Sequence, residues 1–224
     1  MEYILDTADI AAIKHCNEFY PVSGVTTNPS IIAKEKRDFW EIVKEIRSII
    51  GPDKLFFAQT VQKTADKIVE EAKLMNEKSG GEFCVKIPIG EEGLKATKEL
   101  KKLGIKVLMT AIFTPTQALI AAKAGADYVA PYVNRLDNIT GDGCEVVAQI
   151  VEQFAIHNMQ CKVLAASFKN VQQVHNCASA GCQCVTITAD IMESLIKHPM
   201  TDAALVGFEK DWKGTYGDKT ILDF

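Results

Sequence analysis

The chain lacks any apolar stretch long enough to span a bilayer, so no membrane partner is expected. It also lacks a basic block: 29 acidic residues outnumber 25 lysines and arginines, and the net charge of −4 argues against nucleic acid as a partner. No linker rich in proline, serine or glycine interrupts it, and we expect a single domain over residues 1–224. The segment Met1–Asp6 meets an acid at once and carries no charged-then-apolar leader, which predicts a cytoplasmic protein that acts on a small metabolite.

The sequence has no zinc-type pair of cysteines separated by two residues, although it contains seven cysteines. Their odd number and scattered spacing predict reduced, small apolar side chains. The segment Cys182-Gln183-Cys184, with Cys177 nearby, is the one hint of a metal site, but Cys184 opens an apolar run typical of a strand. We therefore expect neither a metal nor another cofactor.

Short apolar runs typical of strands alternate with amphipathic helical patterns along the whole chain, which predicts a compact (β/α)₈ barrel, also called a TIM barrel. The eight expected strands are Tyr3–Asp6, Gly24–Asn28, Leu55–Thr60, Phe83–Pro88, Lys106–Phe113, Tyr128–Val133, Lys162–Ser167 and Cys184–Thr188. Helices are expected between them at Glu92–Leu103, Pro115–Ala124, Cys144–His157 and Val171–Ala180, with Gly104, Gly125 and Gly181 as stops. A doubly wound open sheet is the alternative, but the first strand is followed by Asp6-Thr7-Ala8-Asp9 and not by a glycine-rich phosphate loop.

An additional amphipathic segment, residues 201–217, follows the eighth unit and predicts a C-terminal helix. Leu205, Phe208 and Trp212 recur at spacings near one helical face. A lone barrel does not need this helix. Its apolar stripe either packs on the outer helices of the barrel or contacts a neighbouring subunit.

Lys86 stands inside Phe83–Pro88, a run with the pattern of a fully buried strand. Burial disfavours a charged ammonium and lowers the pKa of a lysine, and a neutral amine is a nucleophile toward carbonyls. The pattern therefore indicates a lysine suited to Schiff-base chemistry. The alternative is an edge-strand lysine whose stem covers apolar surface while its ammonium reaches water.

Polar side chains stand where the expected strands end, which is where barrels of this type gather their reactive groups. They are Asp6, Thr26, Thr27, Asn28, Gln59, Lys86, Thr110, Tyr132, Asn134, Arg135 and Ser167. Singly, each has a structural explanation; Asp6 or Asn28, for instance, could cap the following helix. Together they predict a polar pocket, in which a lysine, a phenol and neutral groups supply the parts for imine chemistry, and Arg135 with Ser167 suits a phosphate.

Several segments resemble the short transaldolases and fructose-6-phosphate aldolases over essentially the whole chain. They are Leu5-Asp6-Thr7, Gly24-Val25-Thr26-Thr27-Asn28-Pro29-Ser30-Ile31-Ile32-Ala33, Val85-Lys86-Ile87-Pro88, Gly125-Ala126-Asp127-Tyr128-Val129-Ala130-Pro131-Tyr132-Val133-Asn134-Arg135 and Leu164-Ala165-Ala166-Ser167-Phe168-Lys169. The resemblance implies a class I aldolase barrel in which Lys86 forms a Schiff base to a dihydroxyacetone unit. It further implies a homo-oligomer, such as a ring-like decamer.

The resemblance also implies roles for the other site residues. Asp6 and Asn28 would contact hydroxyls of the bound ketose and assist proton transfer, and Thr26 would line the same pocket. Arg135 and Ser167 would hold the phosphate of the aldehyde partner.

Two positions bear on which reaction of the family is expected. The transaldolases of this group resemble one another in carrying Glu where this chain has Gln59 and Phe where it has Tyr132, whereas the fructose-6-phosphate aldolases carry Gln and Tyr. Gln59, Thr110 and Tyr132 would hold a water and supply a phenolic proton, so that free dihydroxyacetone is released. Reversible cleavage of fructose 6-phosphate is therefore preferred over transfer of a dihydroxyacetone unit between sugar phosphates. A noncatalytic sugar-phosphate-binding barrel remains the alternative from another class.

Overall fold

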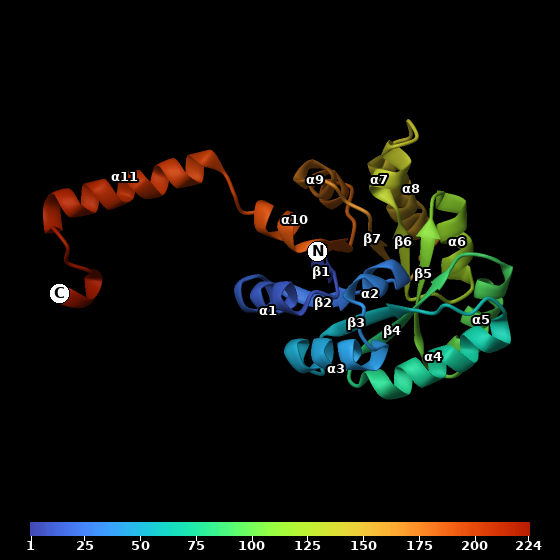
Figure 1. Cartoon of the computed structure of the whole chain (residues 1–224). Coiled ribbons are helices and arrows are strands. Elements are labelled where there is room, and N and C mark those ends of the chain that lie inside the picture. Colours follow the sequence, from blue (N-terminus) through green and yellow to red (C-terminus); the bar gives the residue numbers. More distant parts are fainter. The chain divides into compact units, whose positions relative to one another are not determined.

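The computed structural model describes all residues from Met1 to Phe224, and its eight parallel strands close into a barrel in sequence order (Figure 1). The strands are β1 (Glu2–Asp6), β2 (Val22–Thr26), β3 (Leu55–Gln59), β4 (Phe83–Pro88), β5 (Lys106–Ile112), β6 (Tyr128–Pro131), β7 (Lys162–Ala165) and β8 (Cys184–Ile187). Pairing of β1 with β8 closes the ring and excludes an open doubly wound sheet. The predicted (β/α)₈ barrel with an extra C-terminal helix is thus confirmed.

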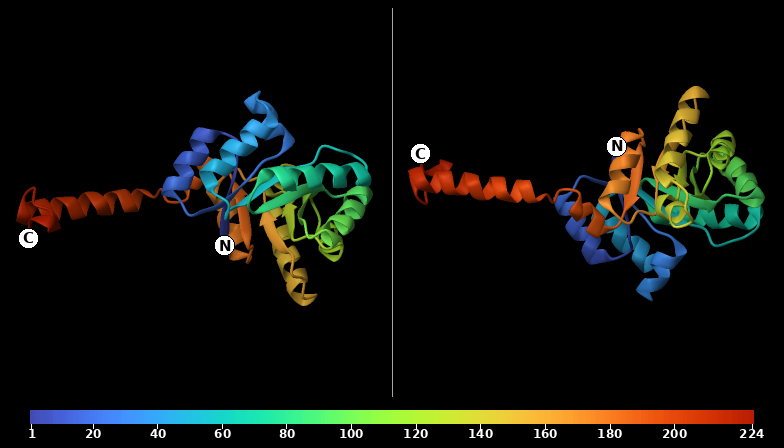
Figure 2. Two further views of the ribbon diagram at one scale, coloured as in Figure 1. Left: turned by 90° about the horizontal axis from the view of Figure 1, so that it is seen from below. Right: turned by 90° about the horizontal axis from the view of Figure 1, so that it is seen from above.

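The helices that connect the strands lie outside the barrel (Figure 2). They are α1 (Ile10–Phe19), α2 (Pro29–Glu35), α3 (Phe39–Ile50), α4 (Ala65–Ser79), α5 (Glu91–Lys102), α6 (Pro115–Lys123), α7 (Val133–Asp137), α8 (Gly143–Ile156), α9 (Val171–Ser179) and α10 (Ala189–Ser194). Gly104, Gly125 and Gly181 follow α5, α6 and α9 with φ angles of 73°, 101° and 82°, which confirms the predicted helix stops. None of the helices combines the length and the apolar character that a membrane crossing requires.

The barrel interior is built in layers, because alternate residues of every strand point inward. One layer is apolar and buried: Ile4, Phe57, Cys84, Leu108, Ala130 and Cys184. Two residues further along the same strands, nearer their C-terminal ends, stand Asp6, Gln59, Lys86, Thr110, Tyr132 and Thr186. The apolar layer therefore forms a floor, and the polar residues form the layer directly above it.

Three strands end earlier than the sequence pattern predicted, whereas the bounds of the other five agree within one residue. The predicted strands Gly24–Asn28, Tyr128–Val133 and Lys162–Ser167 end at Thr26, Pro131 and Ala165. Each has a local cause. Asn28 and Tyr132 are the N-cap residues of α2 and α7, and Ser167 has a φ of 65°, which an extended strand does not allow.

Gly24 of β2 pairs in register with Leu55 of β3. A Cβ atom added to Gly24 would lie 2.2 Å from the carbonyl oxygen of Leu55, far inside the contact distance. Only glycine fits there without moving a strand. This residue therefore sets the spacing of the two strands that carry Thr26 and Gln59.

The chain divides into two compact units, residues 1–192 and residues 193–224. The second unit contains α11 (Pro199–Tyr216), close to the helix predicted over residues 201–217, and a short 3₁₀ helix, η1 (Ile221–Asp223). The indole N–H of Trp212 donates to the carbonyl oxygen of Lys219 at 2.6 Å and holds the chain end against α11. Leu205 and Phe208 are 60% and 69% exposed, and the contact of this helix with a neighbouring subunit stays a prediction.

Candidate active site

A cavity of about 690 Å³ opens at the C-terminal ends of the strands. Seven of the nine residues that are given a role in the expected reaction line it: Asp6, Asn28, Gln59, Lys86, Tyr132, Arg135 and Ser167. The other two, Thr26 and Thr110, are each 1% exposed and lie behind the wall, where they contact residues of the cavity. Thr26 does not line the cavity itself, but its hydroxyl contacts Asp6, which does.

Lys86 lies on the inner face of β4 and is 6% exposed. Its Nζ donates a hydrogen bond of 2.9 Å to the main-chain oxygen of Thr27, the residue that follows β2. Burial lowers the pKa of Lys86, while the negative charge of Asp6 and the nearby Cys84 oppose this shift. Lys86 is thus an interior lysine that reaches the cavity, and the alternative of an edge-strand lysine with its ammonium in water is wrong.

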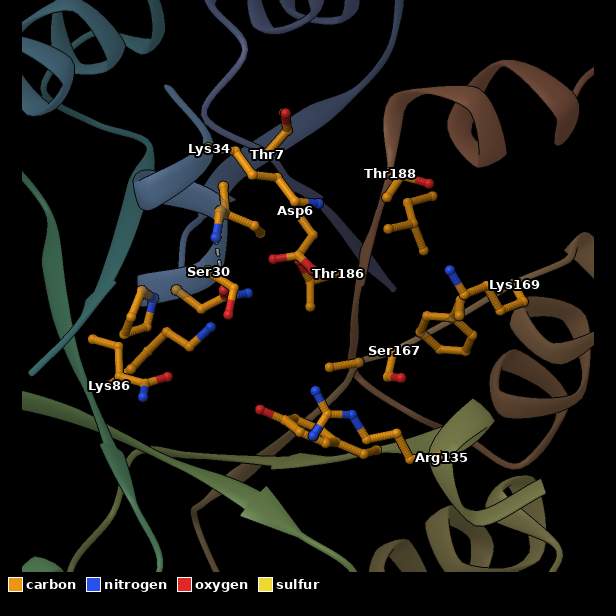
Figure 3. Close-up of a pocket in the computed structure, with 18 of the residues that line it drawn as sticks. Asp6, Thr7, Ser30, Lys34, Lys86, Arg135, Ser167, Lys169, Thr186 and Thr188 are labelled. Atoms are coloured by element: carbon orange, nitrogen blue, oxygen red, sulfur yellow. Dashed lines mark hydrogen bonds between the residues drawn. The ribbon is translucent and has the colours of Figure 1, made fainter. Parts of the chain in front are cut away.

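Asp6 ends β1 and faces the same cavity (Figure 3). The hydroxyl of Thr26 donates to its Oδ1 at 2.8 Å. Thr26 Oγ1 also lies 2.5 Å from the hydroxyl oxygen of Thr186 on β8. Asp6 is not a helix cap, because Asp9 caps α1, so its carboxylate is held by side chains of the barrel interior.

Tyr132 follows β6 and brings a phenol to the cavity. Its hydroxyl lies 3.1 Å from the Thr110 hydroxyl of β5. The rings of Tyr132 and Phe113 make a T-shaped contact at a centroid distance of 5.5 Å. Arg135, on α7, places its guanidinium carbon 4.7 Å from the centre of the Tyr132 ring. Aromatic and cation–π contacts of this kind fix the plane of the ring. The phenol oxygen is consequently held in one place.

Two amides complete the inner wall. Gln59 pairs in register with Lys86 on the adjacent strand, so both side chains enter the cavity at the same level. Asn28 caps α2 by accepting the N–H of Ile31 at 3.0 Å through its Oδ1. Its NH₂ group remains to donate into the cavity, so the predicted cap and the predicted contact with a ligand are compatible.

The mouth of the cavity is rich in positive charge. Arg135 lies with Ser167 on one side, and two further lysines, Lys34 of α2 and Lys169 after β7, also line it (Figure 3). All three cations are exposed, and Glu35 is the acidic residue beside them. An arginine and a hydroxyl together can bind a phosphate through charge-assisted hydrogen bonds.

Thr186, Lys34 and Lys169 are lining residues that the sequence analysis did not single out. Thr186 could have been found from the alternation of β8, because it follows the buried Cys184 by two positions. The two lysines lie in a helix and in a loop, where sequence alone does not reveal which way a side chain faces. No group of three or more histidine, cysteine or acidic side chains is placed to hold a metal ion, and none of the seven cysteines forms a disulfide.

Solved structures with the same fold have little sequence in common with this chain. A mandelate oxidase variant with an FMN adduct is 13% identical, and the similarity covers 93% of this chain and 69% of that one with a TM-score of 0.57. A cube-shaped protein cage, designed by fusing symmetric oligomeric domains, is 16% identical, with 96% and 77% covered and a TM-score of 0.58. These similarities concern the barrel fold alone.

The decisive comparison is with protein families. Residues 3–219 match the family described as Transaldolase/Fructose-6-phosphate aldolase, which spans nearly the whole chain. The function implied is of the aldolase or transaldolase type, on sugar phosphates. This protein belongs to the transaldolase/fructose-6-phosphate aldolase family.

Proposed function

We propose that this protein is a class I aldolase that reversibly cleaves fructose 6-phosphate into dihydroxyacetone and glyceraldehyde 3-phosphate. The observation that carries the proposal is the burial of Lys86 beside an open cavity. Because burial lowers its pKa, a larger share of the side chain is the neutral amine that attacks a carbonyl. A lysine that only neutralised a bound phosphate would work better fully charged and exposed.

The first half of the reaction uses Lys86 and Asp6. The amine attacks C2 of the open-chain ketose, and loss of water from the resulting carbinolamine gives a protonated Schiff base. Asp6 then takes the proton of the C4 hydroxyl, the C3–C4 bond breaks, and its electron pair passes into the iminium as glyceraldehyde 3-phosphate leaves. An enamine of dihydroxyacetone remains on Lys86, and Asp6 holds the proton.

The second half returns the enzyme to its starting state. The enamine is protonated at C3, and the proton that Asp6 holds replaces the one delivered to C3, so no net proton is gained or lost. Water then adds to the resulting iminium, and dihydroxyacetone leaves as the amine of Lys86 is restored. Tyr132 is the proton donor or acceptor in this half, and its phenol is oriented by the Thr110 hydroxyl at 3.1 Å. Gln59, which is level with Lys86, positions the water.

The amide of Gln59 and the phenol of Tyr132 are what favour cleavage over transfer. A carboxylate in place of Gln59 would act as a general base, whereas an amide only orients a water through its hydrogen bonds. With a phenol across the cavity, the enamine can be protonated before an acceptor aldehyde arrives. Release of free dihydroxyacetone is therefore the expected outcome.

Arg135 and Ser167 bind the phosphate of the substrate in this proposal. The guanidinium stacks on the ring of Tyr132, so its position is fixed before a ligand arrives. Lys169, which also lines the cavity near Ser167, adds positive charge at the same end. The C6 phosphate would then lie at the mouth of the cavity while C2 reaches Lys86 at its floor.

A transaldolase that moves a dihydroxyacetone unit between sugar phosphates is the second candidate, since Lys86 and Asp6 serve both reactions equally. The discriminating experiment is an assay with fructose 6-phosphate and no acceptor aldehyde. Release of dihydroxyacetone at a rate comparable to turnover with erythrose 4-phosphate supports the aldolase. Strict dependence on erythrose 4-phosphate supports the transaldolase and rejects the proposal.

Borohydride reduction tests the covalent step separately. The protein is incubated with dihydroxyacetone, reduced, digested and analysed by mass spectrometry. A dihydroxyacetone adduct on the peptide that contains Lys86 is expected, and Lys86→Arg should give none, because arginine keeps the charge but forms no imine. Binding of fructose 6-phosphate without any adduct would instead identify a noncatalytic sugar-phosphate-binding barrel.

A further inference from the structure

We infer that Thr186 is a positioning residue for Asp6, acting through the hydroxyl of Thr26. Thr186 Oγ1 lies 2.5 Å from Thr26 Oγ1, and Thr26 Oγ1 lies 2.8 Å from Asp6 Oδ1. The three groups form a relay from β8 through β2 to the end of β1. This inference rests on the proposed function, because the role of Asp6 as the base that takes the C4 hydroxyl proton is part of that proposal.

The direction of the two hydrogen bonds follows from the number of protons available. A threonine hydroxyl has one proton, and a carboxylate has none to give. Thr26 donates its proton to Asp6 at 2.8 Å, in preference to the main-chain oxygen of Leu5 at 3.5 Å, because the shorter bond is also charge-assisted. Thr186 must therefore be the donor in its contact with Thr26.

The strands place both hydroxyls in the barrel interior, on either side of β1. Asp6 pairs in register with Thr26. Thr186 pairs with Ile4, the inward-facing residue that precedes Asp6 by two positions on β1. Thr26 and Thr186 are 1% and 3% exposed. A buried hydroxyl is costly unless it is hydrogen-bonded, and valine would fill either position with the same shape. The relay accounts for the presence of hydroxyls at both positions.

The consequence for the reaction concerns the orientation and charge of Asp6. The relay engages Oδ1 and leaves Oδ2 to meet the substrate hydroxyl. A donor that itself accepts a hydrogen bond is polarised and becomes a stronger donor, so Thr186 strengthens the hold of Thr26 on the carboxylate. Threonine is also stiff about χ1, which keeps the relay aligned while a substrate binds. Loss of Thr186 should slow bond cleavage and leave Schiff-base formation intact.

The first test compares Thr186→Val, which keeps the shape and removes the hydroxyl, with Thr186→Ser, which keeps the hydroxyl and removes a methyl group. We expect kcat for cleavage to fall about 3- to 10-fold in Thr186→Val, the effect of one neutral hydrogen bond, and to stay within about twofold of wild type in Thr186→Ser. The yield of the borohydride-trapped dihydroxyacetone adduct on Lys86 should be equal in both. Loss of activity in the serine variant but not in the valine variant would show that the methyl group matters, and would overturn the inference. If Thr186→Val does not fold, the pair Thr186→Ala and Thr186→Ser isolates the same hydroxyl.

The second test is a double-mutant cycle with Thr26→Val. If Thr186 acts through Thr26, Thr186→Val should change kcat by less than about twofold once the Thr26 hydroxyl is gone. Losses that multiply in the double variant would mean that Thr186 acts on the substrate directly, and would reject the relay. The two levels of failure are distinguishable. A wild-type protein that gives no adduct on Lys86 refutes the proposed function, whereas an active wild type matched by a fully active Thr186→Val refutes only the relay.

Discussion

Replacing Lys86 with methionine should abolish turnover and yet make the protein more stable. Methionine has nearly the length of the lysine stem, so the packing of β4 is kept while the buried amine is removed. Replacing buried charged groups by apolar side chains of similar volume often stabilises a protein by about 1–4 kcal/mol. The main-chain oxygen of Thr27, which accepts from Nζ at 2.9 Å, loses its partner at a cost of about 1 kcal/mol. A net gain of up to about 3 kcal/mol corresponds to a rise in melting temperature of up to about 12 °C for a chain of this size.

The stability difference between Lys86→Met and wild type should depend on pH. Burial lowers the pKa of Lys86 from its ordinary value of 10.5, against the opposing effect of Asp6. Between the lowered pKa and 10.5 the unfolded chain binds more protons at this position than the folded chain, so wild-type stability rises with pH across that window. The penalty for burying Lys86 is complete below the lowered pKa and absent above 10.5. The advantage of Lys86→Met should therefore shrink as the pH rises toward 10.5.

The assay is urea or thermal unfolding of wild type and Lys86→Met from pH 7 upward, with Lys101→Met as the matched control. Lys101 lies outside the barrel and bonds both carboxylate oxygens of Asp127, at 2.7 and 2.8 Å, with both side chains about a third exposed. The same substitution there should destabilise the protein by up to about 1 kcal/mol. If Lys86→Met lowers stability as Lys101→Met does, or its advantage does not depend on pH, burial of Lys86 carries no penalty and the argument for an activated amine fails.

Three further outcomes are expected. Tyr132→Phe should slow acceptor-free cleavage by about 10²–10⁴-fold, which is the usual effect of losing a proton-transfer group. The borohydride adduct on Lys86 should still form. Unchanged release of dihydroxyacetone would show that the phenol has no part in the mechanism. Arg135→Ala should raise KM for glyceraldehyde 3-phosphate in the synthetic direction by about 10- to 100-fold and leave KM for unphosphorylated glyceraldehyde nearly constant. An equal rise for both aldehydes would place the phosphate elsewhere. Gly24→Ala should destabilise the barrel by at least about 1–3 kcal/mol in urea unfolding, because its Cβ would meet the Leu55 carbonyl oxygen at 2.2 Å. Gly207→Ala, in the open space around α11, is the control and should be neutral or stabilising.

The number and order of the strands were predictable because eight apolar runs alternate with helical patterns, and parallel strands of a barrel are buried on both faces. Their ends were harder to predict. Asn28 and Ser167 follow the apolar runs directly in sequence, but neither belongs to a strand. Asn28 instead caps α2 by accepting the N–H of Ile31, and Ser167 has a φ of 65°. Such effects depend on the neighbouring chain and not on local propensity.

The polar layer was predictable for a similar reason, and its inner connections were not. Strand alternation brings Asp6, Lys86 and Tyr132 to the same end of the barrel. Sequence does not show that Thr26 would donate to a carboxylate, since that depends on the register of β1 against β2. Nor does it reveal the irregular register of β5, where Ala111 adopts a φ of 59° directly after Thr110. Backbone strain of this kind collects at functional sites, where the surrounding structure holds it in place.

The relay that holds Asp6 crosses the seam where the ring of strands closes. Its two hydroxyls belong to the second and the last strand and stand 160 residues apart in the sequence, with the first strand between them. A ribosome-bound or truncated chain that stops before β8 contains Lys86, Asp6 and Thr26 but lacks the Thr186 hydroxyl that donates to Thr26. The full support of the Asp6 carboxylate is thus acquired only when the last strand joins the first.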